Sequence, residues 1–126
     1  MKFQHLMALV VLSLVTVPGA RAATSTWTGA DPSGYWSAPA NWSPAGVPVN
    51  GDALVFPAGL PPGDKVSTND LADGLFRSIS LASGHTIRGN RITLTNDTSV
   101  IINSGTNEIA CDWTFTATSS PSALQN

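Results

Sequence analysis

The chain is poor in cysteine, histidine and charged residues, which supply the cross-links, metal ligands and catalytic groups of many small domains. Among its 126 residues there are one cysteine and two histidines, and only 11% are charged. A single cysteine excludes an internal disulfide, so such a domain would depend on packing and backbone pairing. Basic residues are few and form no stripe, which argues against nucleic acid or an anionic membrane as a partner. Helix-favouring Lys, Glu and Gln are almost missing beyond residue 22: Lys65, Glu108 and Gln125 are the only ones.

The first 22 residues have the pattern of a signal peptide. Lys2 gives a positive start, residues 6–17 form an uncharged apolar run, and Ala20-Arg21-Ala22 offers small residues at both recognition positions of a cleavage site. The run has twelve residues, whereas a membrane span needs about 20. We therefore expect cleavage between Ala22 and Ala23, a mature chain without a membrane span, and secretion or display at the cell surface or outer membrane.

Short alternating runs of β-forming residues fill the second half of the chain, separated by Gly, Asn, Asp or Ser. The runs expected to form strands are 54–56, 75–81, 86–88, 91–95, 99–102 and 108–116. Residues 57–64 are a loop rich in Pro and Gly, and residues 65–74 are polar without a strand pattern. No stretch has apolar residues at helical spacing, so the pattern predicts an all-β protein.

The runs also suggest a repeat of 21 or 22 residues. The matching positions are Ile79 with Val100, Ile87 with Ile109, Ile92 with Trp113, and Leu94 with Phe115. Periods of this length are typical of solenoids, in which each coil buries its apolar side chains against the next. A β-sandwich would also give short strands. Periodicity alone leaves the two folds open.

Three of the four tryptophans and the only tyrosine lie between Trp27 and Trp42. Prolines and glycines in this segment exclude a helix, so we expect an irregular or β-rich element that packs its rings over the first strands as an N-terminal cap. The alternative is a glycan site, in which Trp27, Trp36 and Trp42 stack against sugar rings.

Several short motifs carry a resemblance to a known family. They are Trp27-Thr28-Gly29-Ala30, Gly34-Tyr35-Trp36-Ser37, Asn41-Trp42, Val47-Pro48, Gly51-Asp52 and Leu54-Val55-Phe56, followed by Asn69-Asp70-Leu71, Gly89-Asn90, Ile92-Thr93-Leu94 and Thr106-Asn107-Glu108-Ile109. In this order they resemble the start of bacterial proteins with autotransporter-associated β-strand repeats. The resemblance implies an exported right-handed parallel β-helix within a longer chain, and it supplies no catalytic residue.

These observations predict a right-handed parallel β-helix, or solenoid, with a Trp-rich N-terminal cap, and a β-sandwich as the alternative. The expected parts are a signal peptide (1–22), the cap (23–56), the first coils (57–116) and a truncated Ser/Thr/Pro-rich tail (117–126). We expect a non-enzymatic scaffold or adhesin stalk whose C-terminal end binds further coils or a second copy. The alternative is the N-terminal part of a polysaccharide-active or glycan-binding protein.

The residues that could carry catalysis give no complete site. Asp64, Asp70 and Asp73 could include a carboxylate pair for glycoside hydrolysis, but the sequence of residues 67–74 favours a turn. His85 is the only histidine beyond the leader, which excludes a two-histidine metal site. Cys111 alternates with apolar neighbours, so we expect a buried, inert thiol. The prediction is no enzyme, no cofactor and no metal.

Overall fold

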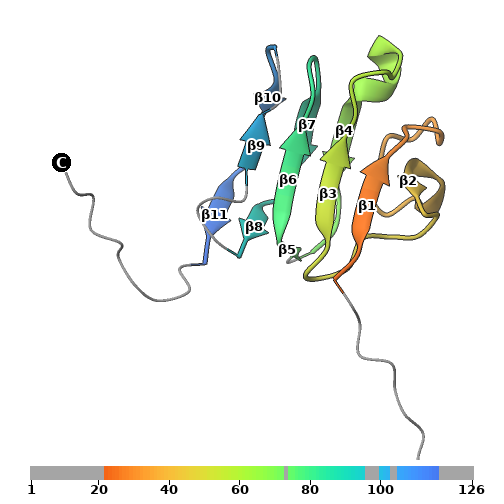
Figure 1. The fold of residues 1–126 in the computed structure, drawn as a ribbon. Helices are drawn as coiled ribbons and strands as arrows, with labels where there is room; N and C mark the ends of the chain where they lie inside the picture. Colours follow the sequence, from red (N-terminus) through yellow and green to blue (C-terminus); the bar gives the residue numbers. More distant parts are fainter. Residues whose placement is uncertain (1–21, 73, 96–99, 103–104, 117–126) are drawn as a thin grey trace, which may run out of the picture.

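The computed structural model describes residues 22–72, 74–95, 100–102 and 105–116 (Figure 1). These residues form strands and two short 3₁₀ helices, and no α-helix occurs among them. The elements are β1 (Thr24–Trp27), η1 (Pro39–Asn41), β2 (Trp42–Ser43), β3 (Ala53–Phe56), η2 (Pro62–Lys65), β4 (Val66–Asn69), β5 (Leu75–Phe76), β6 (Ser78–Leu81), β7 (Thr86–Gly89), β8 (Ile92–Leu94), β9 (Val100–Ile102), β10 (Glu108–Ile109) and β11 (Trp113–Phe115). The expected signal peptide, except Ala22, and the expected tail lie outside the described residues.

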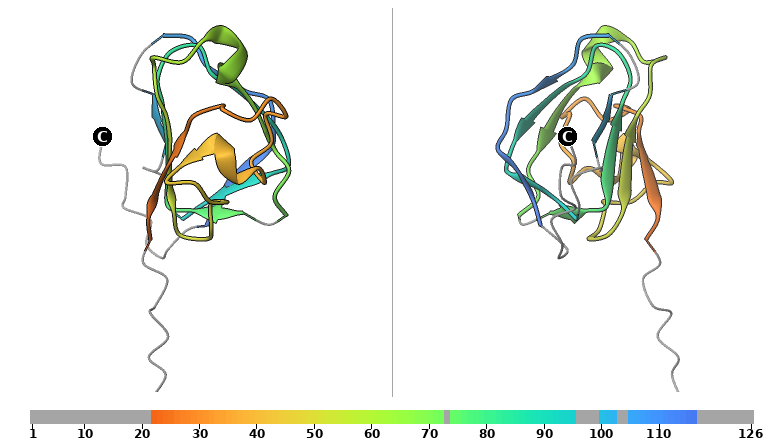
Figure 2. Two further views of the ribbon diagram at one scale, coloured as in Figure 1. Left: turned by 90° about the vertical axis from the view of Figure 1, so that its right-hand side faces the viewer. Right: turned by 60° about the vertical axis from the view of Figure 1, so that its left-hand side comes forward.

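The strands lie in three small sheets. The largest has the order β2-β1-β3-β6-β9, and the other two have the orders β10-β7-β4 and β11-β8-β5. The chain visits the sheets in turn, so that β3, β4 and β5 each lie in a different sheet. The next three strands pair with these in parallel, and β9, β10 and β11 pair in parallel with that second set (Figures 1 and 2).

This arrangement contradicts the predicted right-handed parallel β-helix. The described strands form small separate sheets instead of one continuous solenoid, and the largest sheet is mixed because β2 pairs with β1 in the antiparallel direction. The β-sandwich alternative is also wrong, since every other pairing of these strands is parallel. Alternation in a sequence marks a strand and its inward face, but it does not specify the partner or the direction of pairing.

The predicted spacing of the strands agrees with the pairing register. The residues that were matched at 21 or 22 positions lie opposite each other: Ile79 and Val100, Ile87 and Ile109, Ile92 and Trp113, and Leu94 and Phe115. The run predicted over 108–116 is divided into β10 and β11. The repeat in the sequence therefore corresponds to neighbouring strands of one sheet.

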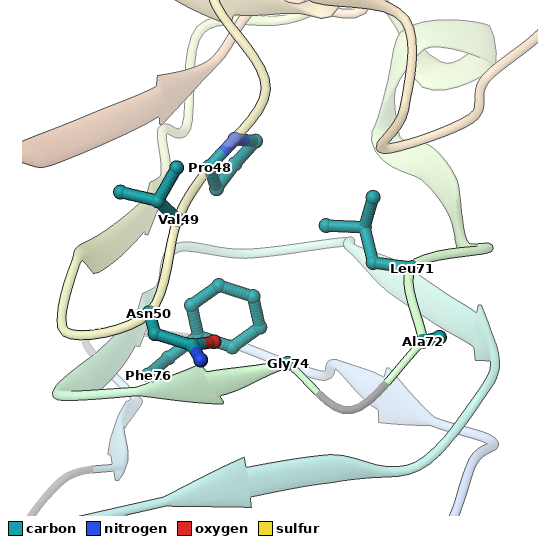
Figure 3. A pocket seen from close by; sticks show the side chains of 7 residues that line it. All are labelled: Pro48, Val49, Asn50, Leu71, Ala72, Gly74 and Phe76. Carbon is teal, nitrogen blue, oxygen red and sulfur yellow. The ribbon is translucent and has the colours of Figure 1, made fainter.

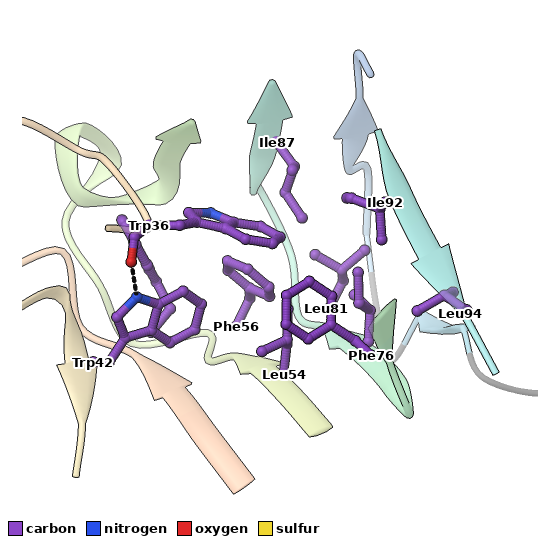
Figure 4. Packing of buried hydrophobic residues seen from close by; sticks show 11 residues of the cluster. Trp36, Trp42, Leu54, Phe56, Phe76, Leu81, Ile87, Ile92 and Leu94 are labelled. Atoms are coloured by element: carbon purple, nitrogen blue, oxygen red, sulfur yellow. Dashed lines mark hydrogen bonds between the residues drawn. The ribbon is translucent and has the colours of Figure 1, made fainter. Parts of the chain in front are cut away.

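Side chains from all three sheets meet in one apolar core (Figure 4). Its members are Trp27, Trp36, Trp42, Leu54, Phe56, Phe76, Ile79, Leu81, Ile87, Ile92 and Leu94. Phe56 connects the aromatic part, because its ring centroid lies 5.8–6.0 Å from those of the three tryptophans. Aromatic pairs at such distances add about 0.5–1.5 kcal/mol each beyond the burial of their area.

Strand β4 was not predicted from the sequence. Its two inward side chains, Ser67 and Asn69, are polar and buried, so no hydrophobic alternation marks it. Asn69 donates from Nδ2 to the carbonyl oxygens of Asn90 (3.0 Å) and Arg91 (3.3 Å), and its Oδ1 accepts from the Leu71 amide (3.1 Å). The buried Asn69 amide therefore connects its own turn with the turn at residues 90–91, and its hydrogen bonds stabilise a position where other strands have an apolar side chain.

Candidate functional site

The two ends of the stack of sheets differ in how their strand edges are covered. We call the end beside β1, β4 and β5 the closed end, because backbone from residues 34–52 covers an edge of each sheet there. The strand β2 pairs with β1, and η1 and β2 lie across this end (Figure 2). In the second sheet, the Trp36 amide donates to the Thr68 carbonyl (3.0 Å), and the Thr68 amide donates to Gly34 (2.8 Å).

The third sheet is covered in the same way at β5. The Gly51 amide donates to the Leu75 carbonyl (2.8 Å), and the Leu75 amide donates to the side-chain oxygen of Asn50 (3.1 Å). The Asn50-Gly51 turn is thus placed against this edge, and Gly51 has the positive φ of 91° that such a turn requires. All three sheets are closed on the same side.

The three tryptophans proposed for sugar stacking lie inside the closed end. Trp27 and Trp36 have no exposed surface and Trp42 is 2% exposed. The Trp27 indole N–H donates to the Asp64 carbonyl (2.7 Å), and that of Trp42 donates to the Trp36 carbonyl (2.9 Å; Figure 4). Stacking on a sugar needs a free ring face, and these rings offer none. Their position is that of a structural cap.

The opposite end, which we call the open end, consists of β9, β10 and β11. Each of these strands is the last in its sheet among the described residues, so one edge of each has no described neighbour. Trp113 is 50% exposed and Phe115 is 38% exposed, and their rings meet edge to face at 5.3 Å. Ile109 and Cys111 are partly buried against the core. Among the described residues, the open end therefore combines uncovered strand edges with an exposed aromatic pair, Trp113 and Phe115.

The candidate carboxylates serve structural contacts. Asp70 accepts hydrogen bonds from the Ser37 amide (2.9 Å) and from the Ser37 hydroxyl. Burial alone would raise the pKa of Asp70, but these hydrogen bonds outweigh it and hold the pKa below its usual value. Asp64 accepts the Trp27 indole through its backbone, and Asp73 lies outside the described residues. A carboxylate that is kept ionised by a neighbouring turn is poorly suited to act as a general acid.

His85 is 1% exposed, and its Nε2 lies 2.8 Å from the Pro57 carbonyl oxygen. Its Nδ1 is buried without a hydrogen-bond partner. Burial lowers the pKa of His85, the Lys65 ammonium lowers it further, and the Pro57 carbonyl acts in the opposite direction. The ring is therefore neutral at physiological pH and packs edge to face on Phe56 (5.5 Å).

Cys111 is half-buried, and burial followed by the nearby Asp112 carboxylate raises the pKa of its thiol. A raised pKa keeps the thiol protonated and slow to react, but the predicted burial of this side chain in the core is wrong, because it is only partly buried. Within the described part of the chain, no three His, Cys, Asp or Glu side chains are grouped to hold a metal ion. No helix in that part is long and apolar enough to cross a membrane.

The surface has a shallow apolar hollow beside the closed end, with a volume of about 560 Å³ (Figure 3). Its lining is formed by Pro48, Val49, Asn50, Leu71, Ala72, Gly74 and Phe76. None of these described side chains ionises, so the lining that the structure describes supplies no group for acid–base or nucleophilic chemistry. Compared with family models, curated proteins and solved structures, the chain matches none of them. The resemblance to autotransporter-associated repeat proteins stays a prediction.

The sequence missed the buried polar residues that hold the closed end together. Asn41 accepts from the Asp31 amide at Oδ1 (2.7 Å) and donates from Nδ2 to the Tyr35 carbonyl (3.0 Å). Asp52 is 3% exposed and accepts three hydrogen bonds. The only signal for either residue was its place beside a turn, which also fits an exposed loop.

Proposed function

We propose that this chain is an exported, non-enzymatic structural module of a scaffold or adhesive surface protein, and that its open end binds by strand addition. The observation that carries the proposal is the asymmetry of the stack: backbone covers an edge of each sheet at the closed end, while one edge each of β9, β10 and β11 at the other end has no neighbour among the described residues. Free parallel edges bind further strands through main-chain hydrogen bonds.

The partner that we propose is a second copy of the chain. Its own open end carries the same three edges and the same aromatic pair, Trp113 and Phe115. At its closed end the outermost strand is the two-residue β2, which pairs with β1 in the antiparallel direction, and irregular backbone lies against the other two sheets, which disfavours a head-to-tail filament. Two copies would then meet open end to open end around a two-fold axis, a contact that closes at the dimer.

Export is proposed from the leader pattern, with cleavage between Ala22 and Ala23. A non-enzymatic role is supported by the structural contacts of Asp70, the buried His85 and the protonated Cys111 thiol. The glycan-binding alternative has less support, since Trp27, Trp36 and Trp42 present no free ring face.

The experiment is sedimentation velocity on the chain beginning at Ala23 over a range of concentrations. We compare the wild type with Trp113→Lys in β11 and with Val66→Lys, a matched change at an exposed apolar residue of β4 (40% exposed) at the closed end. A lysine on a free edge disfavours strand addition. We expect the wild type and Val66→Lys to dimerise and Trp113→Lys to remain monomeric, with all three showing the same circular dichroism. A wild type that is monomeric at every concentration, or equal dimerisation of both variants, would refute the proposal.

A further inference from the structure

The first residue of the predicted mature chain contacts a buried carboxylate. Asp52 is 3% exposed, and its Oδ1 accepts a hydrogen bond from the Ala23 backbone nitrogen at 2.9 Å. Its Oδ2 accepts from the Val49 amide (3.0 Å) and the Ser25 hydroxyl (3.3 Å). The carboxylate therefore sits at the junction of β1 with the turn that precedes β3.

The donors around Asp52 are all uncharged while the leader is attached. Among the described residues, the one ion pair joins Arg91 and Asp112 (3.7 Å), and no cation reaches Asp52. Buried carboxylates are rarely left without a positive partner, because removing a charge from water is costly. The uncleaved chain thus leaves an incomplete site at the start of β1.

Cleavage of the leader at the predicted position would supply the missing positive partner of Asp52. Hydrolysis breaks the peptide bond between Ala22 and Ala23; water supplies the hydroxyl that completes the Ala22 carboxyl group and a hydrogen to the Ala23 nitrogen. At neutral pH this new amine takes up a further proton from solvent and becomes an ammonium. We infer that Asp52 is the acceptor for this new N-terminus, so that leader removal converts a neutral hydrogen bond into an ion pair between an exposed ammonium and a buried carboxylate. The inference rests on the proposed export and cleavage.

The surrounding geometry fits such a contact. The Ala53 amide donates to the Ala23 carbonyl (2.8 Å), and β1 then runs in register with β3 from the pair Thr24 and Ala53. The Ala23 nitrogen is therefore already fixed against Asp52 by the pairing of its own residue. Ala22 and Ala23 are both exposed, so an ammonium would have room and access to water for its remaining hydrogens.

The pair would also stabilise the closed end. Strand β1 lies between β2 and β3, and it ends at the buried Trp27. Holding the start of β1 therefore helps to keep the aromatic cap in place. A protein that folds after export would gain this contact only once its leader has been removed.

The test is a double-mutant cycle on unfolding by urea. One chain begins at Ala23 and the matched control begins at Ala22, which keeps an uncharged amide at Ala23; each is made with Asp52 and with Asp52→Asn. We expect the Ala23 chain to have an unfolding equilibrium constant roughly tenfold lower than the Ala22 chain, and the two Asp52→Asn chains to differ less than about twofold. The same difference between the two starting points in both backgrounds would overturn the inference.

A second measurement serves if Asp52→Asn fails to fold. The stability advantage of the wild-type Ala23 chain should begin to decline as the pH rises past about 8, where a free α-amino group loses its proton, and should disappear once the paired amine has lost its own proton. An advantage that does not change with pH would also overturn the ion pair. The intact mass of the exported protein tests the cleavage separately, and a first residue other than Ala23 would exclude this contact without affecting the dimerisation test.

Discussion

The closed and open ends of the molecule differ in whether other parts of the chain cover the outer strand of each sheet. At the closed end, residues 34–52 supply backbone partners to all three sheets, and three buried tryptophans fill the space beneath them. At the open end, β9, β10 and β11 keep an edge without a described neighbour, and Trp113 and Phe115 are exposed. Both ends contain aromatic side chains, so aromatic residues alone do not form a cap. The closed end differs because it also has polar groups that form hydrogen bonds with the outer strands of the sheets.

The largest difference between the ends should appear when a tryptophan is removed from each. Trp42→Ala deletes a buried ring and its hydrogen bond to the Trp36 carbonyl, so we expect the free energy of unfolding to fall by about 3–5 kcal/mol. Trp113→Ala removes a half-exposed ring and should cost about 1 kcal/mol or less. Urea unfolding followed by circular dichroism measures both. An equal loss of unfolding free energy in the two variants would contradict the proposed difference between the two ends.

The polar groups of the closed end should show the next largest effect. Asn41→Ala leaves the Asp31 amide and the Tyr35 carbonyl without their partner, which should lower the free energy of unfolding by about 1–3 kcal/mol. Glu108→Ala, at the exposed edge of the open end, is the control and should change it by less than about 0.5 kcal/mol. Chemical denaturation of the two variants side by side tests this, and a harmless Asn41→Ala would contradict it.

Acid should weaken the folded state through His85. Burial lowers the pKa of this histidine in the folded chain, and the Lys65 ammonium adds to that effect, so the unfolded chain binds more protons. The stabilisation is fully present above the unfolded pKa of about 6.5. It declines as the pH falls below this value and is lost once the pH has passed the lowered folded pKa. The melting temperature of the wild type between pH 8 and pH 4 should show this decline, and His85→Gln should remove its histidine-dependent part. An identical pH profile for His85→Gln would contradict the assignment.

The smallest effect is expected at Cys111. The thiol is half-buried and its pKa is raised, chiefly by burial, so it should react with iodoacetamide at neutral pH several times more slowly than a cysteine in a short peptide. Cys111→Ser should lower the free energy of unfolding by about 1 kcal/mol or less. Alkylation followed by mass spectrometry measures the rate. An alkylation rate as fast as that of the peptide cysteine would contradict the partly buried position of the Cys111 thiol.

How much of this structure could be predicted depends on which side chains point inward. Where the inward residues are apolar, as in β6 with Ile79 and Leu81, the strand and its pairing offset followed from alternation. Strand β4 was missed because Ser67 and Asn69 point inward. The fold class was wrong because short-range alternation cannot specify that β2 would turn back onto β1 and make that sheet mixed.

Only part of the candidate functional site could be predicted from the sequence. The capping role of the Trp-rich segment followed from its large aromatics among prolines and glycines. The acceptor role of Asp52 could not, because an aspartate after Asn50-Gly51 also fits an exposed turn. Only the pairing of β1 with β3 brings Ala23 to this carboxylate.

The asymmetry of the two ends is tested most directly by residue-resolved hydrogen exchange of the Trp113→Lys variant, which we expect to be monomeric. The Thr68 amide, which donates to Gly34, should exchange only through global unfolding, with the slowest rates in the molecule. The amides of β10 and β11 should exchange faster, through local opening. If the β10 and β11 amides are protected as strongly as that of Thr68, the end described as open is covered, and the central claim fails.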